Sequence, residues 1–429
     1  MIGSNEETLP ANDTARIRGW ICCVASILAA VSYSWVALEA YRAQRLADSP
    51  DGSFLGKAIA LVPANASYHD LLCRRNMFIS QDFERAVIEC RRASELNPYD
   101  SSIWLDLAQA YYSTANEQLS QAAIQKALIV DPTTPNTAWN AANFFLLQGN
   151  ISEAMEQYAI VLREDPSLAP VVLNTYWQSL HDLDGIRGIL PPEPTIYLEL
   201  LRLLLSTGDF RSAGQIWSEL MQLKTTFDFR KALFYIDVLL QAQDVTRASE
   251  AWKDLASRSK ELQAYFEPNN LVTDASFAHQ ILNSGFDWRY TPKPQAAVTL
   301  DTSIYHVGDR SLKIVYSQSN SDAGISQYIA VRPDSRYRVT AWVSSEDIES
   351  ANGPALTVRD AYDHTVYGVT EETLGTTPWH CVVAEFRSGH NTSLLLLALE
   401  RHPGETLIQG RFWIGDIRIV ALSAQEPEC

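Results

Sequence analysis

The chain has 429 residues, a formal net charge of −17 at neutral pH, and 46% hydrophobic residues. That length accommodates two or three domains, and the hydrophobic content is enough to form buried cores, which excludes global disorder. The acidic surplus repels phosphate backbones, so we expect no nucleic-acid partner.

The six cysteines follow no metal-binding pattern, because no two of them have CxxC spacing. No two of the eight histidines have HxxxH spacing either. So few cysteines in so long a chain also argue against a disulfide framework. We therefore expect no metal site, no cofactor and no disulfide framework.

Residues 19–38 contain no charged side chain and follow a polar tail, residues 1–18. A helix of this length spans about 30 Å, the thickness of the hydrocarbon layer of a membrane. Trp20, Trp35 and Tyr41 lie near its ends, where aromatic rings favour the membrane interface. We predict a single transmembrane anchor over residues 19–41 and a linker over residues 42–51. A cleaved signal peptide and a soluble helix are the alternatives.

The charges beside this segment give little information on its orientation. Arg16 and Arg18 precede it, and Arg42 and Arg45 follow it, so the positive-inside rule favours neither side. A short N-terminal tail before an uncleaved anchor usually stays in the cytoplasm. We therefore expect the soluble domains on the extracytoplasmic side.

Prolines recur with a regular period in the next part of the chain. Pro63, Pro98, Pro132 and Pro166 are separated by 35, 34 and 34 residues. Each of the last three ends a similar segment, SELNP, LIVDP or LREDP, in which proline would stop a helix. A period of 34 residues is typical of units made of two antiparallel helices.

The positions inside these units resemble tetratricopeptide repeats (TPRs). Leu107, Ala108 and Tyr111 in one unit, and Ala141 and Ala142 in the next, occupy the large, small and aromatic positions of the family. The resemblance implies an all-α TPR solenoid over residues 52–265. Arg74 and Ser120 depart from it, since each replaces a small residue. The stretch 166–194 is degenerate, and we expect one helix and a loop there.

In TPR proteins the first helices of the units line a groove that binds protein segments. The resemblance places six residues of this chain in or near such a groove: Arg75, Gln109, Tyr112, Trp139, Asn140 and Asn143. The alternative is that these residues form ordinary solvated surface.

The pattern changes after Pro268, where short β-rich segments alternate with turn residues. Segments 337–344 and 410–422 are examples, and 394–400 is apolar on both faces, as in a central strand. In 337–344, Tyr337 and Val339 share one face while Arg338 and Trp342 share the other. We predict an all-β antiparallel sandwich over residues 269–423, followed by a C-terminal tail, residues 424–429.

The order of features resembles jelly-roll carbohydrate-binding modules of the galactose-binding-like type. Asn270, Phe277 and the Trp379 segment stand where that family has its characteristic residues. Ala278 and Gly415 replace acids that often hold a structural calcium in the family, which puts that ion in doubt. Oxygen ligands such as Asp274 and Asp416 leave calcium as an alternative.

Five residues of the sandwich could contact sugars or seal an interface with the last helix pair: Trp288, Arg289, Tyr290, Tyr362 and His364. The rings could stack on a glycan. Equally, each tryptophan could be a core residue of the sandwich, and for Trp288 we favour core or interface.

The catalytic motifs GxSxG, HExxH and the P-loop are absent from the sequence, and we expect no enzyme. The predicted fold class is α+β multidomain, with a transmembrane helix, a TPR solenoid and a jelly roll. Such combinations resemble bacterial proteins of cell-envelope and exopolysaccharide assembly. The resemblance implies a membrane-anchored scaffold with protein partners in its groove. The alternatives are a glycan-binding surface protein and a cryptic glycan-active enzyme.

Overall fold

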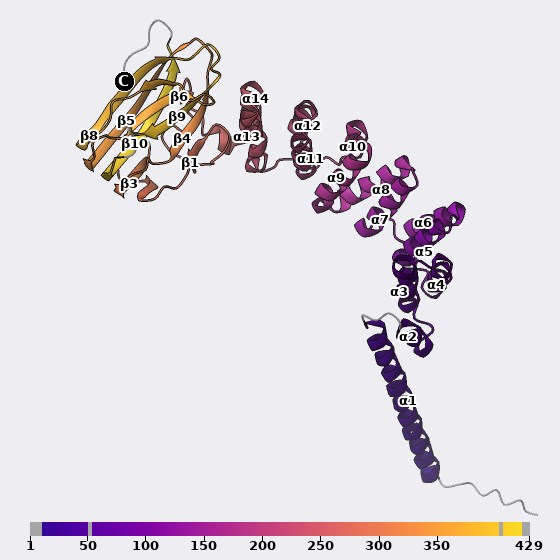
Figure 1. Ribbon diagram of the computed structural model, residues 1–429. Helices are drawn as coiled ribbons and strands as arrows, with labels where there is room; N and C mark the ends of the chain where they lie inside the picture. The colour runs from indigo at the N-terminus through magenta and orange to yellow at the C-terminus, as the bar shows by residue number, and fades with distance from the viewer. Residues whose placement is uncertain (1–10, 50–53, 403–405, 423–429) are drawn as a thin grey trace, which may run out of the picture. The chain divides into compact units, whose positions relative to one another are not determined.

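The computed structural model describes residues 11–49, 54–402 and 406–422, with residues 11–19 described by their backbone alone (Figure 1). The chain divides into two compact units, Met1–Pro191 and Pro192–Cys429. The described part of the first unit is helical, while the second combines helices with two antiparallel sheets. The α+β multidomain class is therefore confirmed.

The first unit is a series of helices joined by short turns. These are α1 (Ala11–Ala47), α2 (Leu55–Leu61), α3 (Ala66–Arg75), the π-helix η2 (Asn76–Ser80), α4 (Phe83–Leu96), α5 (Ser101–Ser113), α6 (Glu117–Val130), α7 (Pro135–Leu147), α8 (Ile151–Glu164), the 3₁₀ turn η3 (Pro166–Leu168), α9 (Ala169–Leu180) and α10 (Leu183–Ile189).

Helix α1 contains the apolar segment predicted as an anchor. Its part Trp20–Ala47 is long and apolar enough to cross a membrane, although signal sequences have the same properties. The helix continues through residues 42–47, where we expected a linker. There Ala43 is fully buried against Ala58 and Tyr68, and the Tyr68 hydroxyl donates a hydrogen bond to Gln44 Oε1 at 3.1 Å. The end of α1 therefore packs as part of the helical stack.

The predicted helix pairs with a 34-residue period are confirmed by the helix boundaries. The second helices α4, α6 and α8 begin at Phe83, Glu117 and Ile151, which are 34 residues apart. Ala108 and Ala142 are fully buried where two helices meet. Ser120, which departs from the family pattern, is also fully buried, and its hydroxyl donates to the Ala108 carbonyl at 3.0 Å. That bond satisfies a polar group in the core.

The stretch predicted as one helix and a loop is a full helix pair, α9 and α10. Helix α10 is short and contains two glycines, which weakened its helical pattern in the sequence. Gly185 has a packing role, because a Cβ atom there would lie 2.0 Å from the Tyr176 hydroxyl. Its missing side chain lets the two helices approach.

A disulfide between Cys73 and Cys90 corrects the expectation drawn from the cysteine count. It joins α3 to α4, with 5.3 Å between the two Cα atoms. The cysteines are 17 residues apart in sequence, but the helix hairpin brings them face to face. The bond holds together the helix pair α3 and α4, in which Arg74 replaces a small residue.

The second unit begins with two more helix pairs and continues into the sandwich. Its helices are α11 (Pro194–Ser206), α12 (Phe210–Gln222), the 3₁₀ turn η4 (Phe229–Ala232), α13 (Leu233–Gln241), α14 (Val245–Arg258) and α15 (Lys260–Gln263). Its strands are β1 (Trp288–Tyr290), β2 (Ala296–Asp301), β3 (Ser311–Ser319), β4 (Ile325–Ala330), β5 (Arg336–Glu349), β6 (Ala355–Asp360), β7 (Val366–Val369), β8 (Gly375–Arg387), β9 (Leu394–Glu400) and β10 (Ile408–Ala421).

The strands form two five-stranded antiparallel sheets, ordered β1-β4-β9-β6-β7 and β2-β3-β10-β5-β8. The doubly apolar strand β9 is central in its sheet, as predicted. In β5 the predicted alternation is confirmed, since Tyr337, Val339, Ala341 and Val343 are all buried. The core lies between the sheets, where Phe277 packs on Trp288 with 4.8 Å between ring centroids.

Candidate binding sites

A cavity of about 400 Å³ lies along the first helices of three consecutive units. Helix α3 with the following π-helix, α5 and α7 supply its lining, which is mostly polar. We call this cavity the TPR groove. Its lining residues are Arg74, Phe78, Ser102, Leu105, Asp106, Gln109, Asn136, Asn140 and Phe144.

A charged cluster lies at one end of the TPR groove. Arg74 Nε is 2.6 Å from Asp106 Oδ2 and 3.3 Å from Asp70 Oδ2, so one guanidinium holds two carboxylates. Burial, followed by the charge of Asp106, raises the pKa of Asp70 to about 7. Burial also raises the pKa of Asp106. Through this cluster, Arg74 links α3 to α5, the first helices of two neighbouring helix pairs. This contact gives the long side chain at position 74 a structural role.

The structure distributes the six predicted groove residues over more than one surface. Gln109 and Asn140 line the TPR groove. Arg75 lines a separate cavity near the end of α1, and Asn143 lines another beside α9.

Two further predicted residues take part in packing between helices. The ring of Tyr112 packs edge-on against Phe144, with 5.4 Å between centroids. Trp139 packs near Tyr158, whose hydroxyl donates to Asn143 Oδ1 at 2.8 Å. Asn143 is therefore engaged by the protein. The Asn140 amide also donates to the Asn136 carbonyl at 2.9 Å and to Asn136 Oδ1 at 3.3 Å, but Asn140 lines the groove together with Gln109.

Trp288, for which we favour core or interface over a sugar site, and Tyr290, a candidate for sugar or interface contacts, belong to the sandwich core. Trp288 is fully buried, and its indole N–H donates to the Asp274 carbonyl at 3.1 Å. Tyr290 is partly buried and packs against the same core. The face of the Trp288 ring is therefore covered by protein.

Arg289 and Tyr362 contact helix α13 and its C-terminal end. Arg289 Nη2 lies 2.6 Å from Asp237 Oδ1, and the Tyr362 hydroxyl donates to the Leu240 carbonyl at 2.8 Å. His364 is exposed in the turn between β6 and β7, where its backbone φ is 64°. Of the five candidates, Arg289 and Tyr362 connect the sandwich to the helices.

Three aromatic side chains that the sequence did not connect lie together on the outer face of the sandwich. The rings of His306 and Trp342 stack with 3.7 Å between centroids, and Trp379 lies 5.8 Å from His306. Trp342 shares the outward face of β5 with Arg338, as the alternation in that segment predicted. Its stacking partner lies in the loop before β3, too far away in sequence for a local pattern to reveal.

The described residues contain no group of three or more histidine, cysteine or acidic side chains arranged to hold a metal ion. Asp274 is buried and accepts the backbone N–H of His279, while Asp416 pairs with Arg418 at 3.0 Å. These two acids, the ligands proposed for calcium, are thus engaged by the protein itself.

No family model matches the sequence, and no curated protein matches it. Similar solved structures include yeast Tom70, at 18% identity and a TM-score of 0.31, over 48% of this chain and 47% of that one. Pseudomonas aeruginosa PilF has 18% identity and a TM-score of 0.25, over 47% and 96% of the two chains. A CBM4 module has 13% identity and a TM-score of 0.28, over 35% and 99%. The assignment of a helical repeat and a β-sandwich to this chain rests on the helix pairs and sheets described above, rather than on these similarities.

Proposed function

We propose that this protein is a membrane-anchored scaffold that holds an extended segment of a protein partner in the TPR groove. The observation that carries the proposal is a single cavity shared by α3, α5 and α7, the first helices of three units. Gln109, Asn136 and Asn140 bring amides to it, and amides can both donate to and accept from a peptide backbone.

The anchor in this proposal is α1, through residues 19–38. Its side chains from Trp20 onward are mostly exposed, as a lipid-facing helix requires. The Cys73–Cys90 disulfide supports an extracytoplasmic location of the repeats, because disulfides persist in oxidising compartments and are rare in the cytosol. Cell-envelope or exopolysaccharide assembly is the process we propose, on the resemblance of the domain combination.

A binding role without catalysis is supported by the positions of the carboxyl groups. Asp287, whose pKa burial raises to about 7, is fully buried in the second unit and out of reach of a substrate. Two further acids, Glu346 and Glu372, are engaged by other groups of the protein. Glu346 pairs with Arg411 at 2.6 Å, and Glu372 accepts the Gly353 N–H at 2.9 Å.

Photo-crosslinking from the groove tests the scaffold proposal in the native host. A photoreactive amino acid in place of Asn136, on the groove, should give a discrete adduct with one protein. The same amino acid in place of Glu156, on the second helix α8, serves as the matched control. Asn140→Arg should abolish the adduct by filling the groove. Equal adducts from both positions, or none from either, would overturn the proposal.

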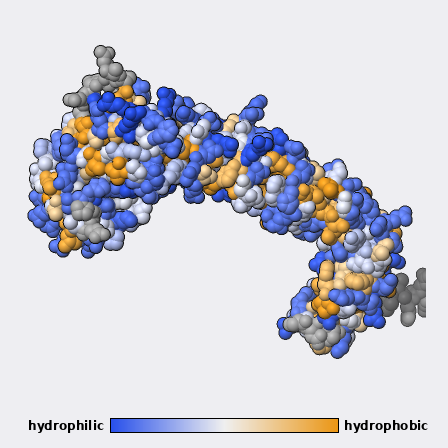
Figure 2. All heavy atoms as spheres, turned by 45° about the horizontal axis from the view of Figure 1, so that its top comes forward, coloured by the Kyte–Doolittle hydropathy of each residue, from blue (hydrophilic) through white to orange (hydrophobic). Residues whose placement is uncertain are grey.

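A glycan-binding sandwich is the second candidate, and the aromatic group on its outer face favours it. Trp342 is partly exposed and stacked on His306, so its ring is held in a fixed orientation. Fixed rings on a sheet surface suit the apolar faces of sugars. Figure 2 shows hydrophilic residues over most of the visible surface of the chain, with hydrophobic residues in separate patches.

A further inference from the structure

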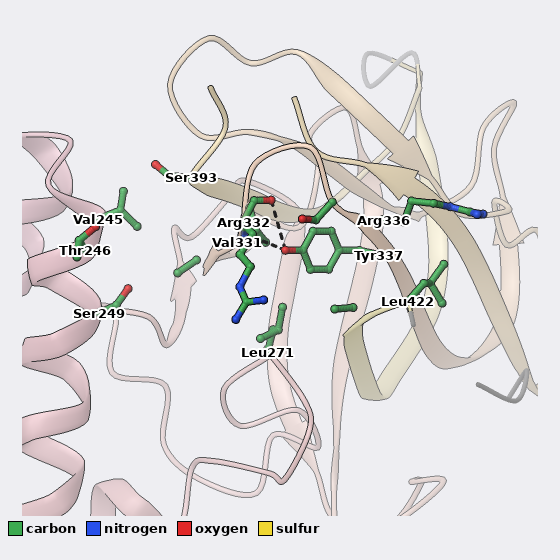
Figure 3. A pocket seen from close by; sticks show the side chains of 13 residues that line it. Val245, Thr246, Ser249, Leu271, Val331, Arg332, Arg336, Tyr337, Ser393 and Leu422 are labelled. Carbon is green, nitrogen blue, oxygen red and sulfur yellow. Dashed lines mark hydrogen bonds between the residues drawn. The ribbon is translucent and has the colours of Figure 1, made fainter. Parts of the chain in front are cut away.

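A cleft of about 730 Å³ separates helix α14 from one end of the sandwich (Figure 3). Val245, Thr246 and Ser249 line it from α14, while Leu271 and Arg332 line it from the other side. This volume lies within the range of about 300–1,000 Å³ found for small-molecule sites. The cleft is distinct from both the TPR groove and the aromatic group around Trp342.

The charge of the cleft is opposite to that of the protein. Among the described residues, its lining includes two arginines, Arg332 and Arg336, and no carboxylate, although the chain has a net charge of −17. Arg336 is engaged by Glu385, with 3.1 Å between the charged atoms. The guanidinium of Arg332 has no hydrogen-bond or ion-pair partner among residues 11–49, 54–402 and 406–422, and it points into the cleft (Figure 3).

The backbone beneath Arg332 is held firmly. Its N–H donates to the Tyr337 hydroxyl at 2.8 Å, and its carbonyl accepts the Ser388 hydroxyl at 2.7 Å. Tyr337 is itself buried in the sandwich core. The positive charge is therefore presented from a fixed turn rather than from a loose loop, which lowers the entropic cost of binding.

Hydroxyl groups and apolar side chains complete the lining. Within the part of the chain that the structure describes, the hydroxyls of Thr246, Ser249 and Ser393 have no hydrogen-bond partner. A hydroxyl donates and accepts, and so do the hydroxyls of a sugar. Leu271, which is 41% exposed, provides an apolar surface for the C–H face of a sugar ring.

We propose that this cleft binds an acidic saccharide, with a sugar carboxylate on Arg332 and sugar hydroxyls on the side chains of α14 and Ser393. A guanidinium and a carboxylate match in a two-point geometry. An acidic peptide fits less well, because its backbone would need an open strand edge. Of the strands that reach the cleft, β5 has no open edge there, because Tyr337 pairs with Ala421 of β10 and with Phe386 of β8. The proposal does not depend on the scaffold function.

Binding to the full-length protein in detergent tests this proposal by calorimetry. The probes are short oligomers of galacturonate, glucuronate and mannuronate, each paired with its methyl ester, which lacks the charge. At least one acid should bind, and its ester should bind about tenfold or more weakly, since hydrogen bonds to charged groups contribute about 1.5–3 kcal/mol.

Two variants locate the site, and one serves as a matched control. Arg332→Gln should weaken binding about tenfold or more, while Arg310→Gln, which removes a charge elsewhere on the sandwich, should leave it unchanged. Thr246→Phe, at an exposed position of α14, should block the cleft without disturbing the sandwich. The proposal is wrong if no acid binds, if acid and ester bind equally, or if Arg332→Gln has no effect. Binding of a poly-glutamate peptide in preference to all three saccharides would also overturn it.

Discussion

At the scale of single residues, the sandwich contains a buried carboxyl group that the protein hydrogen-bonds only in part. Asp287 is fully buried; its Oδ2 accepts the Leu282 N–H at 2.7 Å, while its Oδ1 has no partner among the described residues. Burial raises the pKa of Asp287 to about 7. The folded protein therefore holds a proton that the unfolded chain releases at a much lower pH.

This proton makes stability depend on pH in a defined direction. An unfolded aspartate has a pKa of about 3.9, so the stability due to Asp287 is complete below that pH. It is lost as the pH rises to about 7, by at most about 1.4 kcal/mol per pH unit. Asp287→Asn cannot ionise, so its free energy of unfolding should decline less over this range.

Urea unfolding of both proteins across this pH range measures the difference. Other buried acids, such as Asp70, contribute equally to both proteins and cancel. Asp309→Asn, at an exposed position, should follow the wild-type curve. Parallel curves for wild type and Asp287→Asn would show that the buried carboxyl is ionised throughout.

At the scale of elements, the helix pair α3 and α4 has a covalent link of its own. Helix α3 ends at Arg75 and passes into the π-helix η2, after which Gln81 has a φ of 55°. The Cys73–Cys90 bond lies just before this irregular turn and joins α3 to α4. It compensates for the looser helix contact that a long side chain at position 74 predicts.

Removing this disulfide should destabilise the first unit. Cys73→Ser with Cys90→Ser should lower its free energy of unfolding by about 3 kcal/mol, because the bond closes a loop of 17 residues in the unfolded chain. Thermal melting of wild type and variant measures the loss. Cys22→Ser with Cys23→Ser, which removes two free cysteines of α1, is the control and should melt like the wild type.

Whether Cys73 and Cys90 are oxidised in the host indicates the cellular compartment in which the repeats lie. In protein taken from its host under acid quench, Cys73 and Cys90 should resist maleimide until a reductant is added, as peptide mass spectrometry would detect. Immediate labelling of both thiols would contradict the extracytoplasmic location proposed for the repeats.

At the scale of the whole molecule, the second unit joins the last helices rigidly to the sandwich. Asp237 on α13 accepts hydrogen bonds from the Gly285 N–H at 2.8 Å and from Arg289 Nη2 at 2.6 Å. Gly285 has a φ of 60°, and a Cβ atom there would lie 2.8 Å from the Trp252 ring. Only glycine fits this close contact, so the junction depends on both charge and shape.

Asp237→Ala should uncouple the sandwich from α13 and α14. It leaves the Arg289 guanidinium without its carboxylate, a loss that for half-buried pairs exceeds that of a surface pair. Calorimetry should resolve the joint transition of the second unit into two, and affinity for the acidic saccharide should fall as the cleft loses α14. Asp184→Ala, which removes an exposed carboxylate from the first unit, is the control. A single unchanged transition for Asp237→Ala would show that packing alone holds the junction.

Local periodicity was sufficient to predict most elements of this protein. The 34-residue proline period predicted the helices that begin at Phe83, Glu117 and Ile151, because a proline stops a helix wherever the chain goes next. Alternation predicted the buried face of β5, because successive side chains of any strand point to opposite sides. Helix α10 escaped prediction because Gly185 and Gly188 weaken a pattern that packing against Tyr176 restores.

The candidate sites depended on residues that are distant in sequence, and only the tertiary structure decided them. In the sequence, Arg74 only departs from the repeat pattern. The structure shows that it donates a hydrogen bond to Asp106, 32 residues later. Trp342 stacks on His306, which lies in the loop before β3. Arg332 faces helix α14, which ends at Arg258, more than 70 residues earlier in the chain. The sequence by itself determined the helices and strands, since these depend on neighbours a few residues away. The folded chain decided the disulfide, the junction and the cleft, because they arise from pairs that the sequence separates and only packing brings together.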